Sequence, residues 1–562
     1  MTWPWLFVYL DSSQKQSRRE VLAQFAFISQ VSILIPIAIY QLYRIAAWIL
    51  SKRINCDVAY TALEGSSATK SVVRSSGIAR RWRSVQWWLN GEIASGWGLR
   101  KRWIAAILWF SWLLFLSIFK TGNDYFHLTK RFGSVAAAQL PFHYLLSLRT
   151  RFSPLIILFG TSHEELIKWH RVSGNIIMIL LLIHGSLYLN YYILSSSLIE
   201  HLQRLSTITG LIAVTLGAIL TGTSLDRIRE LSYRVFFLCH LAIGMGLLPI
   251  LFLHARPLQW FTTESLALFI LDRVLRRFDR VTGPVTVSQI SHTDILKIEI
   301  PIKPSKMKRF QNKPAQHVYV SLPSNKKSNF SKRLLSNPFT VASVSSNHIT
   351  LVLRAREGPT TQSLWAHARH FHSKPVISVE GPYGRPVNIR DLSRFDHILL
   401  VAGGIGATFT WPIYWALQEQ IEAEGQDLEK LKFIWAVRST AEASWVTDSE
   451  EEVFAEESNI HIYVTRHQNM EQSFEQDLEL SDEGIEMDDR LASPRSIGGI
   501  TPLIGRPYLK DIVNQTFDIH ADERVAVLFC GPKGMGQELR GHVDRWAVGG
   551  RDIFWHEERF GM

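Results

Sequence analysis

Four histidines in two apolar segments have the residue type and the spacing to hold metal centres inside a membrane. His170 and His184 lie 14 residues apart, and so do His240 and His254. On a helix with 3.6 residues per turn this is just under four turns, so both histidines of a segment share one face, about 21 Å apart. Neutral imidazole is a common axial ligand of haem iron. Two such helices side by side would hold two haems, one between His170 and His240 and one between His184 and His254.

The competing interpretation is that each histidine forms hydrogen bonds between helices or lines a proton path, because buried polar residues in membranes are functional without always being ligands. Four histidines at matched spacing on two strongly apolar segments favour haem ligation. His127, His143 and His163 have no partner at this spacing, and we expect them near the membrane interface.

Seven apolar segments are candidates for the helices that must position these histidines. About 20 mostly apolar residues are needed to cross a hydrocarbon core of about 30 Å. The third candidate is marginal, and the seventh is weak because it carries Glu264 and Asp272. A cleaved signal peptide is not expected, since the first residues lack a basic region and a small-residue cleavage site. The candidates are Val21–Leu50, Trp103–Ile118, Val135–Leu148, Val172–Ile193, Ser206–Leu220, Val235–Leu253 and Trp260–Leu275.

The basic residues indicate the orientation of these helices. The chain of 562 residues carries 61 Lys and Arg against 50 Asp and Glu, a net charge of +11 that a nucleic-acid-binding protein would also show. Ten of the Lys and Arg fall within residues 51–102, and others follow alternate later segments. Positive charge marks cytoplasmic loops, so the C-terminal half is predicted to be cytosolic, and no nucleic-acid partner is expected. The later basic residues are Arg149, Arg151, Arg227, Arg229, Arg273, Arg276 and Arg277.

Alternating strands after Phe278 predict a small antiparallel β-barrel. Within it, Pro338-Phe339-Thr340 can offer an aromatic ring and a hydroxyl to a flavin ring, with Phe339 facing opposite to its neighbours. Arg356, Gly358 and Thr360 then supply a cation, a glycine and a hydroxyl suited to a pyrophosphate. Gly381-Pro382-Tyr383-Gly384 forms a turn that closes the barrel. The predicted strands are Val285–Ile290, Ile295–Ile300, Val318–Leu322, Ile349–Leu353 and Val376–Val379.

From His397 the pattern becomes that of an α/β domain. The apolar strand His397–Ala402 leads into Gly403, Gly404 and Gly406, and then through Thr408 into an apolar helix, Phe409–Leu417. Strand, glycine turn and helix N-terminus together form a phosphate cradle of backbone N–H groups. The spacing is not the strict G-x-G-x-x-G, so an adenine dinucleotide is indicated, with an ordinary glycine turn as the alternative.

Three further features belong to this domain. Arg438 and Arg466 follow the predicted strands Leu431–Val437 and Ile460–Val464; such cations suit a 2′-phosphate and favour NADPH, and solvated arginines are the alternative. Cys530-Gly531-Pro532 ends a strand where a thiol can face the nicotinamide. Residues 470–502 are acidic and predict a disordered insertion.

The three cysteines of the whole chain, Cys56, Cys239 and Cys530, are too widely spaced for a zinc site or a disulfide framework.

Taken together, the motifs resemble those of the fungal ferric reductase family, relatives of the NADPH oxidases. The resemblance covers about residue 119 to the C-terminus. It rests, in the family's order, on Gln139-Leu140-Pro141, the two histidine pairs, Pro-Phe-Thr, Gly-Pro-Tyr-Gly, Gly-Gly-Ile-Gly and Cys-Gly-Pro. The family usually has His before Pro-Phe-Thr, where Asn337 stands here, and it usually ends in an aromatic residue, where Met562 stands here.

The resemblance implies cofactors and site residues. It implies two b-type haems held by the four histidines, FAD at Pro338, Phe339 and Thr340, and NADPH at the Gly403–Gly406 turn. Cys530 and Gly531 would face the nicotinamide, and Phe560 would stack on the flavin. The expected domains are an N-terminal segment with the first helix and a basic loop (1–102), a haem-binding membrane domain (103–277), an FAD-binding barrel (278–390) and an NADPH-binding α/β domain (391–562).

The expected function is transmembrane ferric-chelate reduction. NADPH would give a hydride to FAD, and single electrons would pass through the two haems to Fe(III) chelates or Cu(II) outside the cytosol, in support of an iron-uptake system. The expected location is the plasma membrane, with the vacuolar membrane as the alternative. The alternative functions are a superoxide-generating NADPH oxidase and a non-catalytic membrane transporter with a reductase-like cytosolic half.

Overall fold

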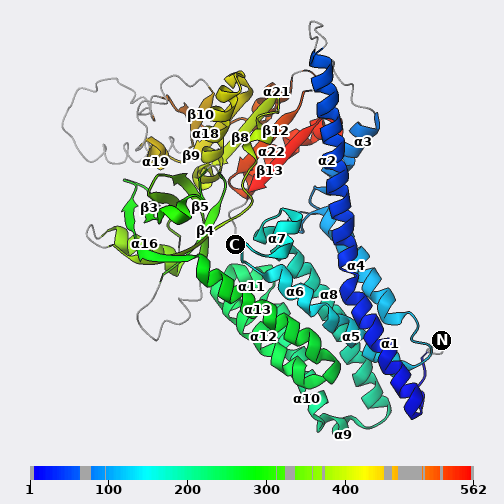
Figure 1. Cartoon of the computed structure of the whole chain (residues 1–562). Helices are drawn as coiled ribbons and strands as arrows, with labels where there is room; N and C mark the ends of the chain where they lie inside the picture. The colour runs from blue at the N-terminus through cyan, green and yellow to red at the C-terminus, as the bar shows by residue number, and fades with distance from the viewer. Residues whose placement is uncertain are drawn as a thin grey trace, which may run out of the picture. The chain divides into compact units, whose positions relative to one another are not determined.

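A computed structural model of the chain forms two compact units (Figure 1). The first contains Met1–Ser71 and Leu89–Asp279, and the second contains Val72–Trp88 and Arg280–Gly561. The residues that the structure describes are 5–63, 77–94, 96–311, 313–322, 336–356, 358–369, 374–447, 459–465, 497, 500–518, 520 and 523–558.

The first unit is a bundle of helices (Figure 1). Helix α8 packs against α5 and α6, and α12 packs against α10 and α13. Many large apolar side chains point outward from the bundle, as expected of a surface in contact with lipid. The helices are α1 (Ser12–Val31), α2 (Leu34–Leu63), α4 (Arg100–Ile118), α5 (Tyr125–Ala138), α6 (Leu140–Ser147), α7 (Pro154–Phe159), α8 (His163–Leu194), α9 (Leu198–Leu202), α10 (Leu205–Thr223), α11 (Asp226–Leu231), α12 (Tyr233–His254) and α13 (Gln259–Asp279).

Five helical stretches in the described residues are long and apolar enough to cross a membrane. They coincide with five of the seven predicted segments. The third predicted segment is broken at Gln139, because Pro141 stands in the first turn of α6 and cannot continue α5. The seventh is helix α13, which carries too many charges to qualify. The five stretches are Ser12–Ala46, Arg100–Ile118, His163–Leu194, Leu205–Thr223 and Tyr233–His254.

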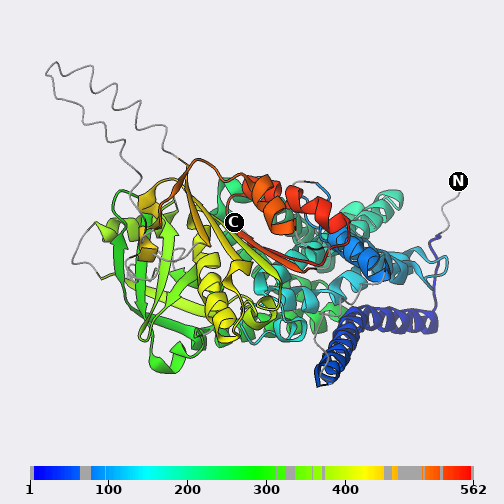
Figure 2. The same ribbon diagram turned by 90° about the horizontal axis from the view of Figure 1, so that it is seen from above.

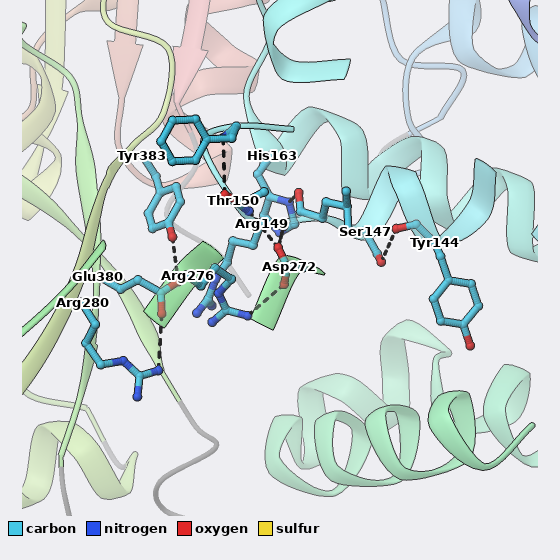
Figure 3. Close-up of polar contacts among 12 residues, drawn as sticks. Tyr144, Ser147, Arg149, Thr150, His163, Asp272, Arg276, Arg280, Glu380 and Tyr383 are labelled. Carbon is cyan, nitrogen blue, oxygen red and sulfur yellow. Dashed lines mark hydrogen bonds and ion pairs between the residues drawn. The ribbon is translucent and has the colours of Figure 1, made fainter. Parts of the chain in front are cut away.

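The acidic residues of α13 are compensated within the bundle. Glu264 accepts a hydrogen bond from Gln30 Nε2 at 2.7 Å. The buried carboxylate of Asp272 accepts the backbone N–H groups of Arg149 and Thr150, both at 2.9 Å, and pairs with Arg276 (Figure 3). Since each carboxylate has partners, α13 can stand in the bundle despite its charge.

Side-chain caps fix where the two histidine-bearing helices begin. Ser162 accepts the backbone N–H of Glu165 before α8, and acidic residues in the first turn of α8 favour the positive end of the helix dipole. Ser232 caps α12 in the same way by accepting the backbone N–H of Val235. From these starts, α8 carries His170 to His184, and α12, which contains Pro249, carries His240 to His254.

The second unit contains a curled antiparallel sheet of seven strands in the order β1-β7-β4-β5-β6-β3-β2. Alternate residues such as Leu296 and Ile298, Val318 and Val320 form its buried core. The predicted strands are present, and β1 and β5 are added to them. The bounds are β1 (Arg280–Pro284), β2 (Thr286–Gln289), β3 (Ile295–Pro301), β4 (His317–Ser321), β5 (Asn337–Val344), β6 (His348–Arg354) and β7 (Val376–Tyr383).

A parallel sheet of six strands follows, in the order β11-β10-β9-β8-β12-β13. Helix α18 (Ala407–Ala423) packs on one face of this sheet, and α21 (Leu509–Phe517) and α22 (Lys533–Val548) pack on the other (Figure 2). This is a doubly wound α/β arrangement, which binds ligands at the carboxyl ends of its strands. The bounds are β8 (His397–Gly403), β9 (Leu431–Val437), β10 (Ile460–Val464), β11 (Leu503–Ile504), β12 (Val525–Cys530) and β13 (Ile553–Glu558).

Helix α3 (Gly77–Leu89) lies between α2 and α4 in the sequence, yet most of it belongs to the second unit. Trp87 Nε1 donates a hydrogen bond to Asp544 of α22 at 2.7 Å, and the Trp87 ring meets Trp555 of β13 edge-on. Arg540 lies 4.5 Å from the centre of the Trp87 ring. An early segment of the chain therefore completes the surface of the nucleotide-binding sheet.

Candidate functional site

The first pair of histidines, His170 and His240, face one another from α8 and α12. Their ring centroids are 6.0 Å apart. His170 Nδ1 donates to the carbonyl oxygen of His143 at 3.0 Å. His240 Nδ1 lies 3.2 Å from Ser224 Oγ, which donates its own proton to a backbone carbonyl and so accepts from the ring. Both rings are thus held through Nδ1, which leaves Nε2 as the free ligand atom.

The second pair, His184 and His254, repeats this arrangement further along the same two helices. The ring centroids are 6.5 Å apart. His184 Nδ1 donates to the carbonyl oxygen of Thr129, and His254 Nδ1 donates to that of Ser206, both at 2.7 Å. The predicted pairing of the four histidines across α8 and α12 is therefore the one that the geometry brings together.

The residues present fit a haem iron between the rings of each pair. A metal bound by two imidazole nitrogens at about 2 Å places the ring centroids about 6 Å apart, as found at both pairs. Glycines make room beside the second pair: a Cβ on Gly133 or on Gly210 would lie 2.8 Å from the ring of His184 or His254. A backbone carbonyl or hydroxyl on the second nitrogen is the usual support of a metal-bound histidine.

His127, His143 and His163, the other three histidines considered in the bundle, each have a specific contact within it. The His143 ring stacks on that of His170, with centroids 3.9 Å apart, a contact that the histidine spacing did not predict. His127 is buried and hydrogen-bonds to Arg131, and His163 is buried against the carbonyl of Leu148. His127 and Arg131 are four residues apart on α5, a spacing that the sequence does show, whereas the partners of His143 and His163 come from distant segments.

The predicted flavin motif lies on β5 next to β4. Thr340 pairs with His317 and Pro338 with Tyr319, so these four residues share one face of the sheet. Phe339 points the other way and packs against the core of the curled sheet. The expected opposite orientation of Phe339 is therefore found, and it turns this ring away from the face that carries Thr340.

His317 and Tyr319, which no predicted motif contained, and Tyr383 from the Gly-Pro-Tyr-Gly motif complete this face. His317, Tyr319 and Tyr383 form an aromatic cluster with centroids 5.4–6.1 Å apart. The Tyr383 hydroxyl donates to buried Glu380 at 2.6 Å, and Glu380 also pairs with Arg280 (Figure 3). The alternation His317-Val318-Tyr319-Val320 was the available signal, since it sets two polar rings on one face and two valines on the core face.

The predicted pyrophosphate residues lie at the start of α16 (Pro359–Ala368). Gly358 is the N-cap residue, Thr360 is buried in the first turn, and Arg356 is exposed beside it. Thr361 Oγ1 donates to the carbonyl oxygens of Arg356 and Gly358, which fixes the turn that leads into the helix. The backbone N–H groups of this first turn suit an anion.

The glycine turn after β8 meets the end of β12. A Cβ on Gly406 would lie 2.1 Å from the carbonyl oxygen of Cys530, and one on Gly403 would lie 2.5 Å from Pro532. Gly404 has φ +54°, and its carbonyl accepts a hydrogen bond from Trp435 Nε1 at 2.9 Å. Glycine is required here because the two strand ends approach more closely than any side chain allows.

Other predicted residues gather at the same edge of the parallel sheet. Thr408 Oγ1 donates to the carbonyl of Ile405, and Gly531 lies against Gly403. Arg438 is exposed after β9, and its backbone N–H donates to Glu442, a residue that sequence reasoning missed. Phe560, Arg466, and residues 470–496, 498 and 499 of the acidic insertion lie outside the described residues.

Cys530 is fully buried at the end of β12 and packs in the core of the sheet. Burial raises the pKa of its thiol well above the ordinary value, and the carboxylates of Glu558 and Glu557 raise it further. The thiol is therefore protonated at neutral pH. Its side chain is enclosed in the core, and the contact with the nicotinamide stays a prediction.

Comparison with known families agrees with this order of parts. Residues 132–251 match the ferric reductase like transmembrane component, residues 282–387 match an FAD-binding domain, and residues 395–544 match the ferric reductase NAD binding domain. The chain thus carries a ferric reductase like transmembrane component followed by FAD-binding and NAD-binding domains. The chain belongs to the ferric reductase family.

Individual relatives are distant. The chain is 29% identical over 269 residues to ferric reduction oxidase 5 of Arabidopsis thaliana, covering 46% of this chain and 36% of the relative. It is 26% identical over 432 residues to ferric/cupric reductase transmembrane component 2 of Saccharomyces cerevisiae, covering 72% and 57%. It is 23% identical to the probable metalloreductase AIM14 of Meyerozyma guilliermondii, covering 75% and 83%. In the first two relatives the match spans less than two thirds of the relative's length.

A solved flavohemoglobin from Malassezia yamatoensis aligns with 76% of this chain and 96% of its own, at 16% identity and a TM-score of 0.35. A similarity at this level carries no argument about function.

Proposed function

We propose that the protein is a membrane ferric-chelate reductase that takes electrons from NADPH and delivers them across the membrane to Fe(III) chelates, with Cu(II) as a second acceptor. The observation that carries the proposal is the pair of facing histidine couples, 6.0 and 6.5 Å between ring centroids, each ring held through Nδ1. Bound FAD and two b-type haems would convert a two-electron hydride donor into one-electron steps.

The chain's own groups support each part of this function. The four Nε2 atoms would bind iron, and their Nδ1 hydrogen bonds hold each ring in the orientation that binding needs. The Gly403–Gly406 turn and the start of α18 suit a pyrophosphate, and Arg438 is free to meet a 2′-phosphate as NADPH requires. Thr340, His317 and Tyr319 supply a hydroxyl and two rings on one face for a flavin.

The membrane orientation belongs to the proposal. The arginines at the ends of alternate helices favour a cytosolic second unit. Electrons would then leave on the far side of the membrane, next to His184 and His254. We propose the plasma membrane as the location, with the vacuolar membrane as the alternative, and coupling of the product to an iron-uptake system.

One reduced-minus-oxidised absorbance spectrum of the purified full-length protein tests the proposal, with NADPH as the reductant. We expect b-type haem bands in the wild-type protein. In H254A we expect about half of this haem absorbance to disappear and intact cells to lose ferric-chelate reduction. The control is H201A, because His201 on α9 belongs to neither pair and should leave the spectrum unchanged.

The result also separates the alternatives. Wild-type protein without haem absorbance would contradict the reductase proposal and favour a transporter. Haem bands with a signal that superoxide dismutase removes, and without ferric reduction, would identify oxygen as the acceptor.

A further inference from the structure

We propose that His143 is a positioning residue for the first histidine pair and that the short helix α6 sets the orientation of the His170 ring. This inference rests on the proposed ligation of haem by His170 and His240. His143 belongs to neither of the two histidine pairs and to none of the glycine motifs.

Two contacts from the same residue act on His170. The His143 ring lies parallel to the His170 ring, with centroids 3.9 Å apart and planes 19° apart. The His143 carbonyl oxygen accepts the hydrogen bond from His170 Nδ1 at 3.0 Å. The hydrogen bond selects the tautomer that leaves Nε2 free, and the parallel ring limits rotation of the imidazole about its own axis.

The second pair has no equivalent of this arrangement among the described residues. The rings that contact His184 are Tyr188 and His254, and they meet it at 79° and 81°. Its Nδ1 partner is the carbonyl of Thr129, whose side chain carries no ring. The stacked histidine therefore makes the first pair different from the second.

The fold makes room for this stacking and extends it to the opposite helix. Gly174 lies one turn after His170, and a Cβ there would stand 3.1 Å from Cε1 of His143. The neighbouring Tyr144 donates its hydroxyl to the carbonyl oxygen of Gly244 at 2.5 Å, one turn after His240 on α12. Consecutive residues of α6 thus contact both ligand-bearing helices at the same level. The carbonyl of Tyr144 in turn accepts from Ser147, which braces this end of α6 (Figure 3).

These contacts do not satisfy the hydrogen-bonding capacity of the His143 ring. Its Nδ1 is buried and has no hydrogen-bond partner among the described residues. A buried polar atom without a partner is unfavourable, so a leucine or phenylalanine would fill this place at lower cost if packing alone mattered. Because a haem ligand is tuned by the groups around it, the parallel imidazole is placed to influence the first centre and not the second.

The test uses purified full-length protein, with haem content, the electron paramagnetic resonance spectrum of the oxidised state and a potentiometric titration as readouts. In H143L the ring is lost while the backbone carbonyl remains. We expect two haems per chain, with one of the two low-spin signals and one of the two midpoint potentials shifted. H143F keeps a flat ring and should restore the wild-type signal position more closely than H143L.

A second variant tests the same geometry without altering His143. G174A places a Cβ against the ring and should shift the same signal, whereas G246A on α12 should shift neither, because a Cβ there meets nothing within 4 Å. This pair keeps the test decisive if H143L fails to fold.

The outcomes separate cleanly. Unchanged spectra and potentials in both H143L and G174A would overturn the positioning role while leaving the reductase proposal intact. Loss of one haem in both H143L and H143F would also overturn it, because the imidazole itself would then be a ligand. Absence of haem from the wild-type protein would instead contradict the proposed function.

Discussion

Arg354 at the end of β6 donates a hydrogen bond to Glu442 beyond β9 at 2.7 Å, joining the curled sheet to the parallel sheet. The Glu442 carboxylate is buried, 6% exposed, and its second oxygen accepts the backbone N–H of Arg438. Arg354 also pairs with Asp294, whose carboxylate is 45% exposed. The Arg354 guanidinium therefore pairs with one buried and one exposed carboxylate, so substitutions of Glu442 and Asp294 can be compared directly.

We expect E442Q to weaken the join between the two sheets and D294N to leave it nearly unchanged. Removing one partner of a buried ion pair costs about 3–5 kcal/mol, whereas an exposed pair contributes about 0–1 kcal/mol. The stability of each variant is measured by thermal unfolding of the purified protein, and the effect on the nucleotide site is measured by the KM for NADPH. Equal shifts in the two variants would contradict the assignment of Glu442 as the structural partner.

Alanine at Gly406 should damage the nucleotide-binding edge. The added Cβ would lie 2.1 Å from the Cys530 carbonyl oxygen, so the β8 turn or the end of β12 must move. Overpacking of this kind costs about 1–3 kcal/mol, and G406A should also raise the KM for NADPH. The control is G534A on α22, where a Cβ meets nothing within 4 Å. Wild-type NADPH kinetics in G406A would show that the turn does not approach the nucleotide.

Gly210 and Gly222 on α10 offer a similar comparison in the membrane bundle. A Cβ on Gly210 would lie 2.8 Å from the His254 ring, and one on Gly222 would meet nothing within 4 Å. We therefore expect G210A, and not G222A, to lower or shift the absorbance of one haem. Pyridine haemochrome assay of both variants gives the haem content. Two haems with unchanged spectra in G210A would argue against His254 as a ligand.

The thiol of Cys530 should react slowly with thiol reagents in the folded protein. Its pKa is raised by burial and by nearby carboxylates, so the reactive thiolate is scarce at pH 7 and increases only as pH rises toward that higher pKa. In the C56S/C239S variant, which leaves Cys530 as the one thiol of the sequence, reaction with an aromatic disulfide reagent at pH 7 to 8 should be slow before denaturation and rapid after it. Rapid reaction of the native C56S/C239S protein would show that the end of β12 opens.

Local sequence patterns predicted the parts of this protein whose partners lie nearby or at regular spacing. The four histidines at intervals of 14 residues and the glycine turn after β8 are of this kind, since periodicity and a strand–turn–helix order are readable along the chain. The curled and parallel sheets followed from alternation and from apolar runs.

The features that could not be predicted from the sequence depend on contacts between distant segments of the chain. The place of α13 in the helical bundle could not be predicted from composition, because Asp272 counts as a charge until its partners, the backbone N–H groups of Arg149 and Thr150, are known. His143 carries no periodic signal, because its contact with His170 comes from the separate helix α6. Phe339 and Thr340 were both predicted as part of the flavin motif, and they lie on opposite faces of the sheet. The sequence did not show which of these faces packs on the core and which is open to a ligand.

The docking of α3 also has a consequence for how the chain is made. Trp87 and its hydrogen-bond partner Asp544 are 457 residues apart, so the helix leaves the ribosome long before α22 and β13 exist to receive it. During synthesis the Trp87 ring stays uncovered, and a chain that stops early keeps it so, in a form that chaperones and proteases recognise. A recombinant fragment begun at Arg280 would have the opposite defect, an orphaned Asp544 and Trp555, and supplying residues 77–89 as a separate peptide should improve its solubility.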